Sequence, residues 1–139
     1  MRALILGVVL TLLIPPALAE KPTAPEEIDG IKRLDAEGTV QLILNEPELV
    51  IIDARKREEY AKGHIEGAIS LLNTTMDREK LAAHVATLQT PVLFYCNGAR
   101  CLRSSNAAKK ALSWGYNNLY WFRGGWVEWQ EKGLPVAHY

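Results

Sequence analysis

Two short apolar runs constrain the fold most strongly. Leu49–Ile52 and Val92–Tyr95 are continuous rather than alternating, as is typical of strands that helices cover on both faces. Helix-period segments lie between and after them, at residues 36–44, 56–62, 77–88, 104–114 and 126–132. Further short strands are expected at 31–34, 68–70 and 118–121. This alternation predicts an α/β domain with an open, mostly parallel central sheet flanked by helices on both faces.

Polar and glycine residues indicate where the helices begin and end. Asp35 is expected to cap the helix that starts beside it, while Gly63 and Gly115 are expected to close two others. The apolar side chains expected to face the core from the helices 36–44 and 77–88 are Val40, Ile43, Leu44, Leu81, Val85 and Leu88.

The amino-terminal residues have the pattern of an export signal. Met1-Arg2 precedes an apolar run that reaches Ile14, and Ala17-Leu18-Ala19 supplies the small residues of a cleavage site. We therefore predict a signal peptide over 1–19, a polar tether over 20–29 and the folded domain over 30–139, in a protein exported to the bacterial periplasm. An uncleaved membrane anchor is the weaker alternative, because the run is shorter than the roughly 20 residues that span a bilayer.

Composition excludes several classes of function. The chain has 139 residues, enough for one domain, with 16 Lys+Arg against 16 Asp+Glu. This balance gives no electrostatic reason to expect a nucleic-acid partner. The 2 cysteines are too few for a disulfide scaffold or a structural zinc site, and no paired histidines complete a metal-ligand set. We therefore expect no bound metal.

The loop after the second apolar run carries the chemistry. Cys96 follows a buried strand directly, at the sheet edge where open α/β folds place their ligand sites. The next residues, 97–103, lead into a helix, so their amides can converge on the sulfur and favour a thiolate. Arg100 and Arg103 add positive charge that suits an oxyanion substrate. A disulfide between Cys96 and Cys101 that staples an exported domain is an equally open interpretation.

Three segments together resemble a known family. They are Ile52–Arg55 with the following 59–69 (EYAKGHIEGAI), the strand-borne Cys96 with its loop, and the closing residues 115–116, 121–126, Trp129 and 133–136. In this order they are similar to the signatures of the rhodanese-homology domain, and the resemblance runs from about Ile31 to Val136.

The resemblance implies a sulfurtransferase. Cys96 would take sulfane sulfur from a donor such as thiosulfate, carry it as a persulfide and pass it to cyanide or a thiol, without a cofactor. The implied substrate-binding residues are Asn97, Gly98, Ala99, Arg100, Cys101 and Arg103. Asp53 and Arg55 would support the loops, and the segment around Trp126 would lie near the cysteine loop. His64 is expected to be a turn residue rather than a base.

Two departures from the family pattern leave alternatives open. The loop is about two residues longer than in short sulfurtransferases of the family. The arginine of the related phosphatase and arsenate-reductase branch would fall at Leu102, which disfavours that branch. Cys101 is placed to act as a resolving thiol that attacks oxidised Cys96. The alternatives are a thiol-redox protein cycling Cys96 and Cys101, or a non-catalytic binding module with this fold.

Overall fold

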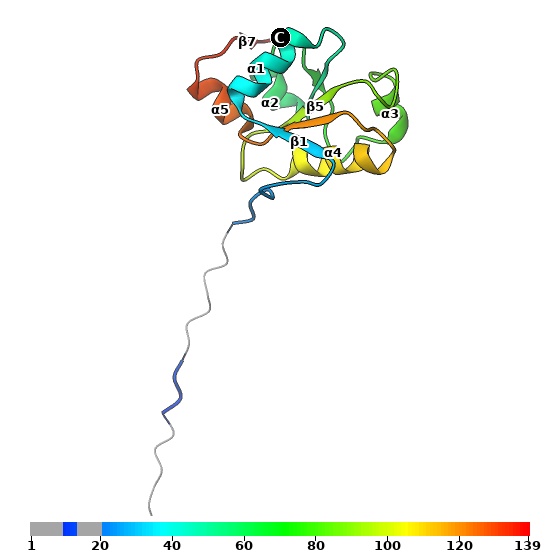
Figure 1. Ribbon diagram of the computed structural model, residues 1–139. Helices are drawn as coiled ribbons and strands as arrows, with labels where there is room; N and C mark the ends of the chain where they lie inside the picture. The colour runs from blue at the N-terminus through cyan, green and yellow to red at the C-terminus, as the bar shows by residue number, and fades with distance from the viewer. Residues whose placement is uncertain (1–9, 14–20) are drawn as a thin grey trace, which may run out of the picture.

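A computed structural model describes residues 10–13 and 21–139 of the chain (Figure 1). The predicted signal peptide therefore lies almost entirely outside the described residues. Among the helices of the described part, none has the length and apolar content needed to cross a membrane.

A parallel sheet forms the centre of the domain. Its strands are β1 (Ile31–Leu34), β2 (Val50–Asp53), β4 (Ile69–Ser70), β5 (Val92–Tyr95) and β6 (Leu119–Phe122), in the order β1-β6-β5-β2-β4. Every pairing in it is parallel. The two apolar runs predicted as buried strands are neighbours at its centre. A small antiparallel pair, β3 (His64–Ile65) with β7 (Val136–Ala137), lies apart from it.

Helices cover both faces of the sheet, as predicted. They are α1 (Ala36–Asn45), α2 (Arg57–Lys62) and α5 (Gly125–Glu131) on one face, and α3 (Arg78–Ala82) and α4 (Arg103–Ser113) on the other (Figure 1). Alternate strand residues supply two separate cores. Phe94 packs with α3 and α4, whereas its neighbours Leu93 and Tyr95 pack with α1, α2 and α5. The predicted α/β fold class is confirmed.

The start of α1 follows the prediction, but its buried face is rotated. Asp35 accepts a hydrogen bond from the Gly38 amide at 2.7 Å, as an N-cap does. Ala36 and Thr39 are buried, and Leu44 is 72% exposed. Leu44 was predicted to face the core and does not, because it lies one residue, or about 100° of helical rotation, beyond Ile43.

The third helix is shorter than the sequence predicts. α3 ends at Ala82, although Leu81 and Val85 are both buried as expected. Thr87 and Thr90 exchange side-chain and backbone hydrogen bonds of 3.1 Å, which replace helical bonds with a turn. Leu88 is therefore 44% exposed and does not continue the apolar face.

Candidate active site at two cysteines

The candidate site lies at the carboxyl end of β5. Cys96 follows Tyr95 directly, residues 97–102 form a loop, and α4 begins at Arg103. The strand fixes one end of the loop and the helix the other, which places both cysteines at the edge of the parallel sheet. Both are free thiols in the structure.

Cys96 is enclosed by its neighbours. Its side chain is 1% exposed, and its thiol lies 3.1 Å from Ser104 Oγ and 3.3 Å from the carbonyl oxygen of Cys101. The Ser104 amide donates to Cys96 Sγ at 3.3 Å, and Trp121 Nε1 donates to Ser104 Oγ at 3.0 Å. The pKa of Cys96 is raised, because its thiol is hydrogen-bonded to Cys101 and because burial disfavours the thiolate.

Cys101 lies in the opposite environment. Its side chain is partly exposed, and its amide donates to the Gly98 carbonyl at 2.9 Å, which turns the loop back on itself. The pKa of Cys101 is lowered to about 5, chiefly because the Cys96 thiol hydrogen-bonds to it. The backbone amides of Asn97 and Arg103 and the Arg103 side chain also lower this pKa, and together these effects outweigh that of burial.

The amide cradle therefore differs from the one that the sequence predicts. We expected the loop amides to converge on Cys96, but among the described residues the amide that donates to its sulfur is that of Ser104, in the first turn of α4.

An open cavity of about 930 Å³ lies over this loop. It is lined by all the predicted substrate-binding residues, Asn97, Gly98, Ala99, Arg100, Cys101 and Arg103. Cys96 is not among the residues that line it. The cavity therefore presents two arginines and one of the two thiols to a ligand.

Residues from distant segments complete the cavity wall. Sequence reasoning missed them: Asn73, Asn106, Val127, Glu128 and Glu131. Among the described buried side-chain polar atoms, Asn73 Oδ1 alone has no hydrogen-bond partner. Nothing in the local sequence indicates these residues, because only the tertiary packing brings them to the loop.

Part of the segment predicted as a tether, residues 20–29, contributes to the site. We call residues 22–26 the N-terminal strap. Ala24 is 2% exposed and donates its amide to the Ala99 carbonyl at 2.7 Å. Arg123 donates to the carbonyls of Ala24 at 3.0 Å and Pro25 at 2.9 Å. Pro22 lines the cavity, so the strap forms part of its mouth.

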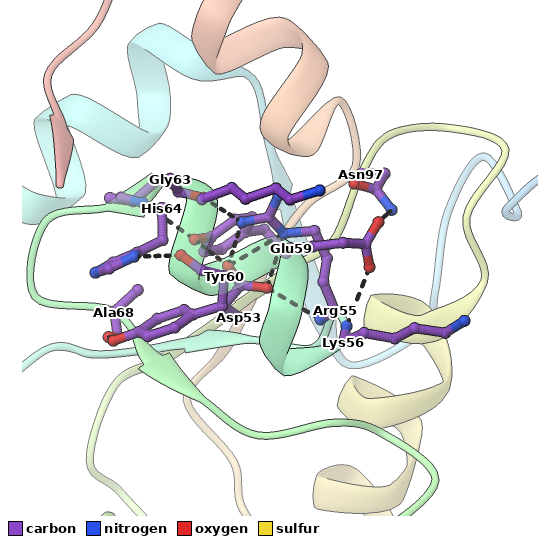
Figure 2. A network of polar contacts seen from close by, with 12 residues as sticks. Asp53, Arg55, Lys56, Glu59, Tyr60, Gly63, His64, Ala68 and Asn97 are labelled. Atoms are coloured by element: carbon purple, nitrogen blue, oxygen red, sulfur yellow. Dashed lines mark hydrogen bonds and ion pairs between the residues drawn. The ribbon is translucent and has the colours of Figure 1, made fainter. Parts of the chain in front are cut away.

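Asp53 and Arg55 form a buried network beside the site (Figure 2). Arg55 donates to Asp53 Oδ2 and to the Gly63 carbonyl, each at 2.7 Å, and Tyr95 donates to Asp53 Oδ2 at 2.6 Å. Burial alone would lower the pKa of Arg55, but the hydrogen bond and charge of Asp53 outweigh it, so that pKa is raised. The pair does not line the cavity and instead supports the surrounding elements.

A second set of contacts ties this network to the cysteine loop. Asn97 Nδ2 donates to Glu59 at 3.0 Å, which Figure 2 shows as the link between α2 and the loop. The amide of Trp126 donates to the Cys96 carbonyl at 2.8 Å, so this segment lies beside the loop as expected. The Trp126 ring, however, covers the Arg55 guanidinium at 4.8 Å instead of facing the cavity. Gly125 has φ +54°, and a Cβ there would collide with the Cys96 carbonyl.

His64 is held as a structural residue. Its ring stacks on Tyr60 at 3.7 Å, and its Nδ1 lies 2.7 Å from the Tyr60 carbonyl oxygen. It does not line the cavity. Within the described residues, no group of three or more His, Cys, Asp or Glu side chains is arranged to hold a metal ion.

Comparison with known proteins identifies the family. Residues 37–132 match the rhodanese-like domain family. Because this match covers more than half of the chain, the protein belongs to the rhodanese-like domain family, as the resemblance implied. Among solved structures, a thiosulfate sulfurtransferase from Pseudomonas aeruginosa is similar, with a TM-score of 0.67 and 28% identity over 78% of this chain and 20% of that one. A rhodanese-like domain from Anabaena sp. gives a TM-score of 0.65 and 26% identity, covering 77% and 79% of the two chains.

Curated relatives extend this picture. The chain is 34% identical over 106 residues to the tRNA uridine(34) hydroxylase of Enterobacter sp., and 34% identical over 110 residues to that of Erwinia tasmaniensis. Each match covers 70% of this chain and 29% of the relative. The chain thus spans less than a third of the length of these curated relatives.

Proposed function

We propose that this protein transfers sulfane sulfur from a small anionic donor such as thiosulfate to a thiol or to cyanide. A cysteine of the loop, which the sequence assigns as Cys96, carries the sulfur as a persulfide. The observation that carries the proposal is the pair of thiols held among backbone amides and arginines at a cavity. A persulfide is anionic at its outer sulfur, and amide and guanidinium donors stabilise such a charge without a general base.

The residues that line the cavity indicate the chemical class of the sulfur donor. Arg100 and Arg103 both line it, and each adds a fixed positive charge that suits a sulfur-bearing oxyanion. The similarity to a thiosulfate sulfurtransferase supports the same class. A tRNA substrate is not part of the proposal, because the chain matches only 29% of the tRNA-modifying relatives and has no excess of basic residues.

We further propose that the protein acts in the periplasm after removal of residues 1–19. The export pattern of the first residues supports this step. The intact mass of the protein recovered from a bacterial periplasmic fraction should match a chain that begins at Glu20. A mass that retains the first 19 residues would refute it.

A thiol-redox function is the second candidate, because the Cys96 thiol is hydrogen-bonded to Cys101. The same two thiols could cycle between dithiol and disulfide without handling sulfane sulfur. In that case the oxidised protein would lack two hydrogens, and thiosulfate would add nothing to the reduced form.

The intact mass of the purified, mildly pre-reduced protein, before and after thiosulfate, separates the two candidates. Sulfur transfer predicts one added sulfur atom that cyanide removes, and no addition to the double variant Cys96→Ser/Cys101→Ser. Failure of the reduced wild-type protein to gain sulfur would overturn the sulfurtransferase proposal.

A further inference from the structure

The cysteine loop is held by two different parts of the chain. Its first half is held by the first turn of α5, where the Trp126 amide donates to the Cys96 carbonyl at 2.8 Å. The next amide, that of Val127, donates to the Asn97 carbonyl at 2.9 Å. All of these residues lie within 37–132, the part of the chain that matches the family.

The second half of the loop is held by the strap, which lies outside that matched range. The Ala24 amide donates at 2.7 Å to the carbonyl of Ala99, the residue directly before Arg100. Ala24 is 2% exposed and belongs to the apolar core that contains Phe94, against which Leu102 of the loop also packs. The strap and the second half of the loop are therefore joined by one hydrogen bond and by a shared core.

The strap in turn is held by Arg123. Its guanidinium donates to the carbonyls of Ala24 at 3.0 Å and Pro25 at 2.9 Å, and it lies 3.2 Å from the Glu26 carboxylate. The Arg123 side chain is 13% exposed, so its hydrogen bonds are largely shielded from water, which strengthens them. Arg123 thus holds the same residue whose amide holds the loop.

Arg100 depends on these contacts for its position. It is an exposed residue that lines the cavity, so the backbone around it, rather than close packing of its side chain, determines where it lies. That backbone is fixed before Arg100 by the strap at Ala99, and after it by the 2.9 Å hydrogen bond from the Cys101 amide to the Gly98 carbonyl. Arg103, in contrast, is already part of α4 and is held by the helix.

We propose that Arg123 and the strap are positioning elements of the sulfur-transfer site, which hold Arg100 where it binds the anionic donor. This inference rests on the proposed sulfurtransferase function and adds to it residues that do not touch the substrate. Arg123 acts on the strap, the strap acts on Ala99, and of these residues and Arg100 only Arg100 contacts the donor. Release of the strap should therefore weaken the binding of thiosulfate and leave the transfer of sulfur from Cys96 to the acceptor in place.

Steady-state kinetics of the purified protein, with thiosulfate as donor and cyanide as acceptor, provide the first test. Arg123→Ala should raise the KM for thiosulfate at least about threefold and change kcat by less than about twofold, because the lost interaction contributes to donor binding. Arg123→Lys, which keeps a donor for one of the two carbonyls, should raise KM less. Lys109→Ala removes an exposed cation on α4 and is the matched control. With folding of each variant verified by circular dichroism, an unchanged KM in Arg123→Ala, or a loss confined to kcat, would overturn the inference.

A double-mutant cycle shows whether the effect passes through Arg100. In an Arg100→Ala background, Arg123→Ala should raise KM by less than about 1.5-fold, because the side chain that the strap positions is already absent. In an Arg103→Ala background it should keep its full effect, since Arg103 is held by α4. Equal increases in the two backgrounds would overturn the inference.

Hydrogen exchange provides a test that needs no sulfur transfer. In Arg123→Ala, the Cys101 amide should exchange at least about threefold faster, because the strap no longer holds the turn that this amide closes. The amides of Trp126 and Val127, which hold the first half of the loop, are internal controls and should be unchanged. Unchanged exchange at Cys101 would overturn the inference. If Cys101 exchanges faster but the reduced wild-type protein gains no sulfur from thiosulfate, the anchoring of the loop by the strap stands and the sulfurtransferase proposal fails.

Discussion

Cys96 and Cys101 carry the same thiol group five positions apart, and their surroundings give them opposite properties. The hydrogen bond between the two thiols, together with burial, raises the pKa of Cys96, and the same hydrogen bond lowers the pKa of Cys101. Ser104 lies between the loop and the core, since its hydroxyl contacts both Cys96 and Trp121. The properties of the two thiols thus depend on contacts within the loop and the first turn of α4.

The reaction of Cys101 with iodoacetamide should be nearly independent of pH from about 6.5 to 8 and half-maximal at about pH 5. The sign follows from the lowered pKa: the thiolate persists as the pH falls until it is protonated near 5. A free cysteine, with a pKa of about 8.5, is the reference. Cys96→Ala, which loses the donated hydrogen bond, should have a higher midpoint. A wild-type midpoint near that of free cysteine would contradict this environment.

Ser104→Ala should lower the free energy of unfolding by about 1–3 kcal/mol, because it leaves the buried Trp121 Nε1 without its acceptor. Urea unfolding followed by tryptophan fluorescence measures the change. Ser113→Ala is the matched control, since Ser113 is exposed on the same helix and its loss should change the value by less than about 0.5 kcal/mol. Equal effects of the two substitutions would show that the Ser104 contacts contribute little.

At the scale of elements, the strap shows how a polar segment becomes part of a site. It lies within residues 20–29, whose composition, with Lys21, Glu26 and Glu27, is that of a tether. Hydrogen bonds of its backbone nevertheless attach it to the cysteine loop, to Arg123 and to Arg33. Its position therefore depends on contacts with residues that are distant in the sequence, Arg123 and Ala99 among them.

Arg123→Ala should release the strap and leave the sheet intact. Hydrogen exchange of the Ala24 amide should become at least about tenfold faster, because the arginine no longer holds the carbonyls on either side of the Pro25 peptide bond. Lys109→Ala is the control, because Lys109 is an exposed cation on α4, away from the strap. Unchanged exchange at Ala24 in Arg123→Ala would show that the Ala99 contact alone retains the strap.

The sequence predicts the central elements well and the connecting ones poorly. Buried apolar runs and helix-closing glycines locate β2, β5 and most helices, because burial on both faces leaves a pattern within one segment. The β3–β7 pair has two residues in each strand, too few for any period to be seen. The cavity-facing role of Cys101 depends on how a longer loop folds at Gly98, and spacing alone does not determine that.

Over the whole molecule, the Asp53–Arg55 network connects segments that are distant in the chain. Its hydrogen bonds join the end of β2 to Tyr95 of β5 and to Gly63, the residue that closes α2 and precedes β3. Asp53 is fully buried and Arg55 is 2% exposed. The stability of the fold therefore depends on keeping both charges paired.

Asp53→Asn should cost about 3–5 kcal/mol of unfolding free energy, because it leaves the Arg55 charge buried without a counter-charge. Urea unfolding measures the loss. Asp29→Asn, at an exposed position, should change stability by less than about 0.5 kcal/mol. A loss below about 1 kcal/mol for Asp53→Asn would mean that Trp126 and the Gly63 carbonyl are sufficient to hold the guanidinium.

The strap also determines how the protein can be handled in the laboratory. It passes the cavity mouth at Pro22, whereas Tyr139 at the other end of the chain donates its amide to the carbonyl of Ala61 in α2 (Figure 1). A purification tag or surface linker on a chain that begins at Glu20 would start within about 7 Å of chain length from the mouth. Attachment through the carboxyl terminus leaves the mouth open, so it is the better choice for immobilising the protein or for fusing a reporter to it.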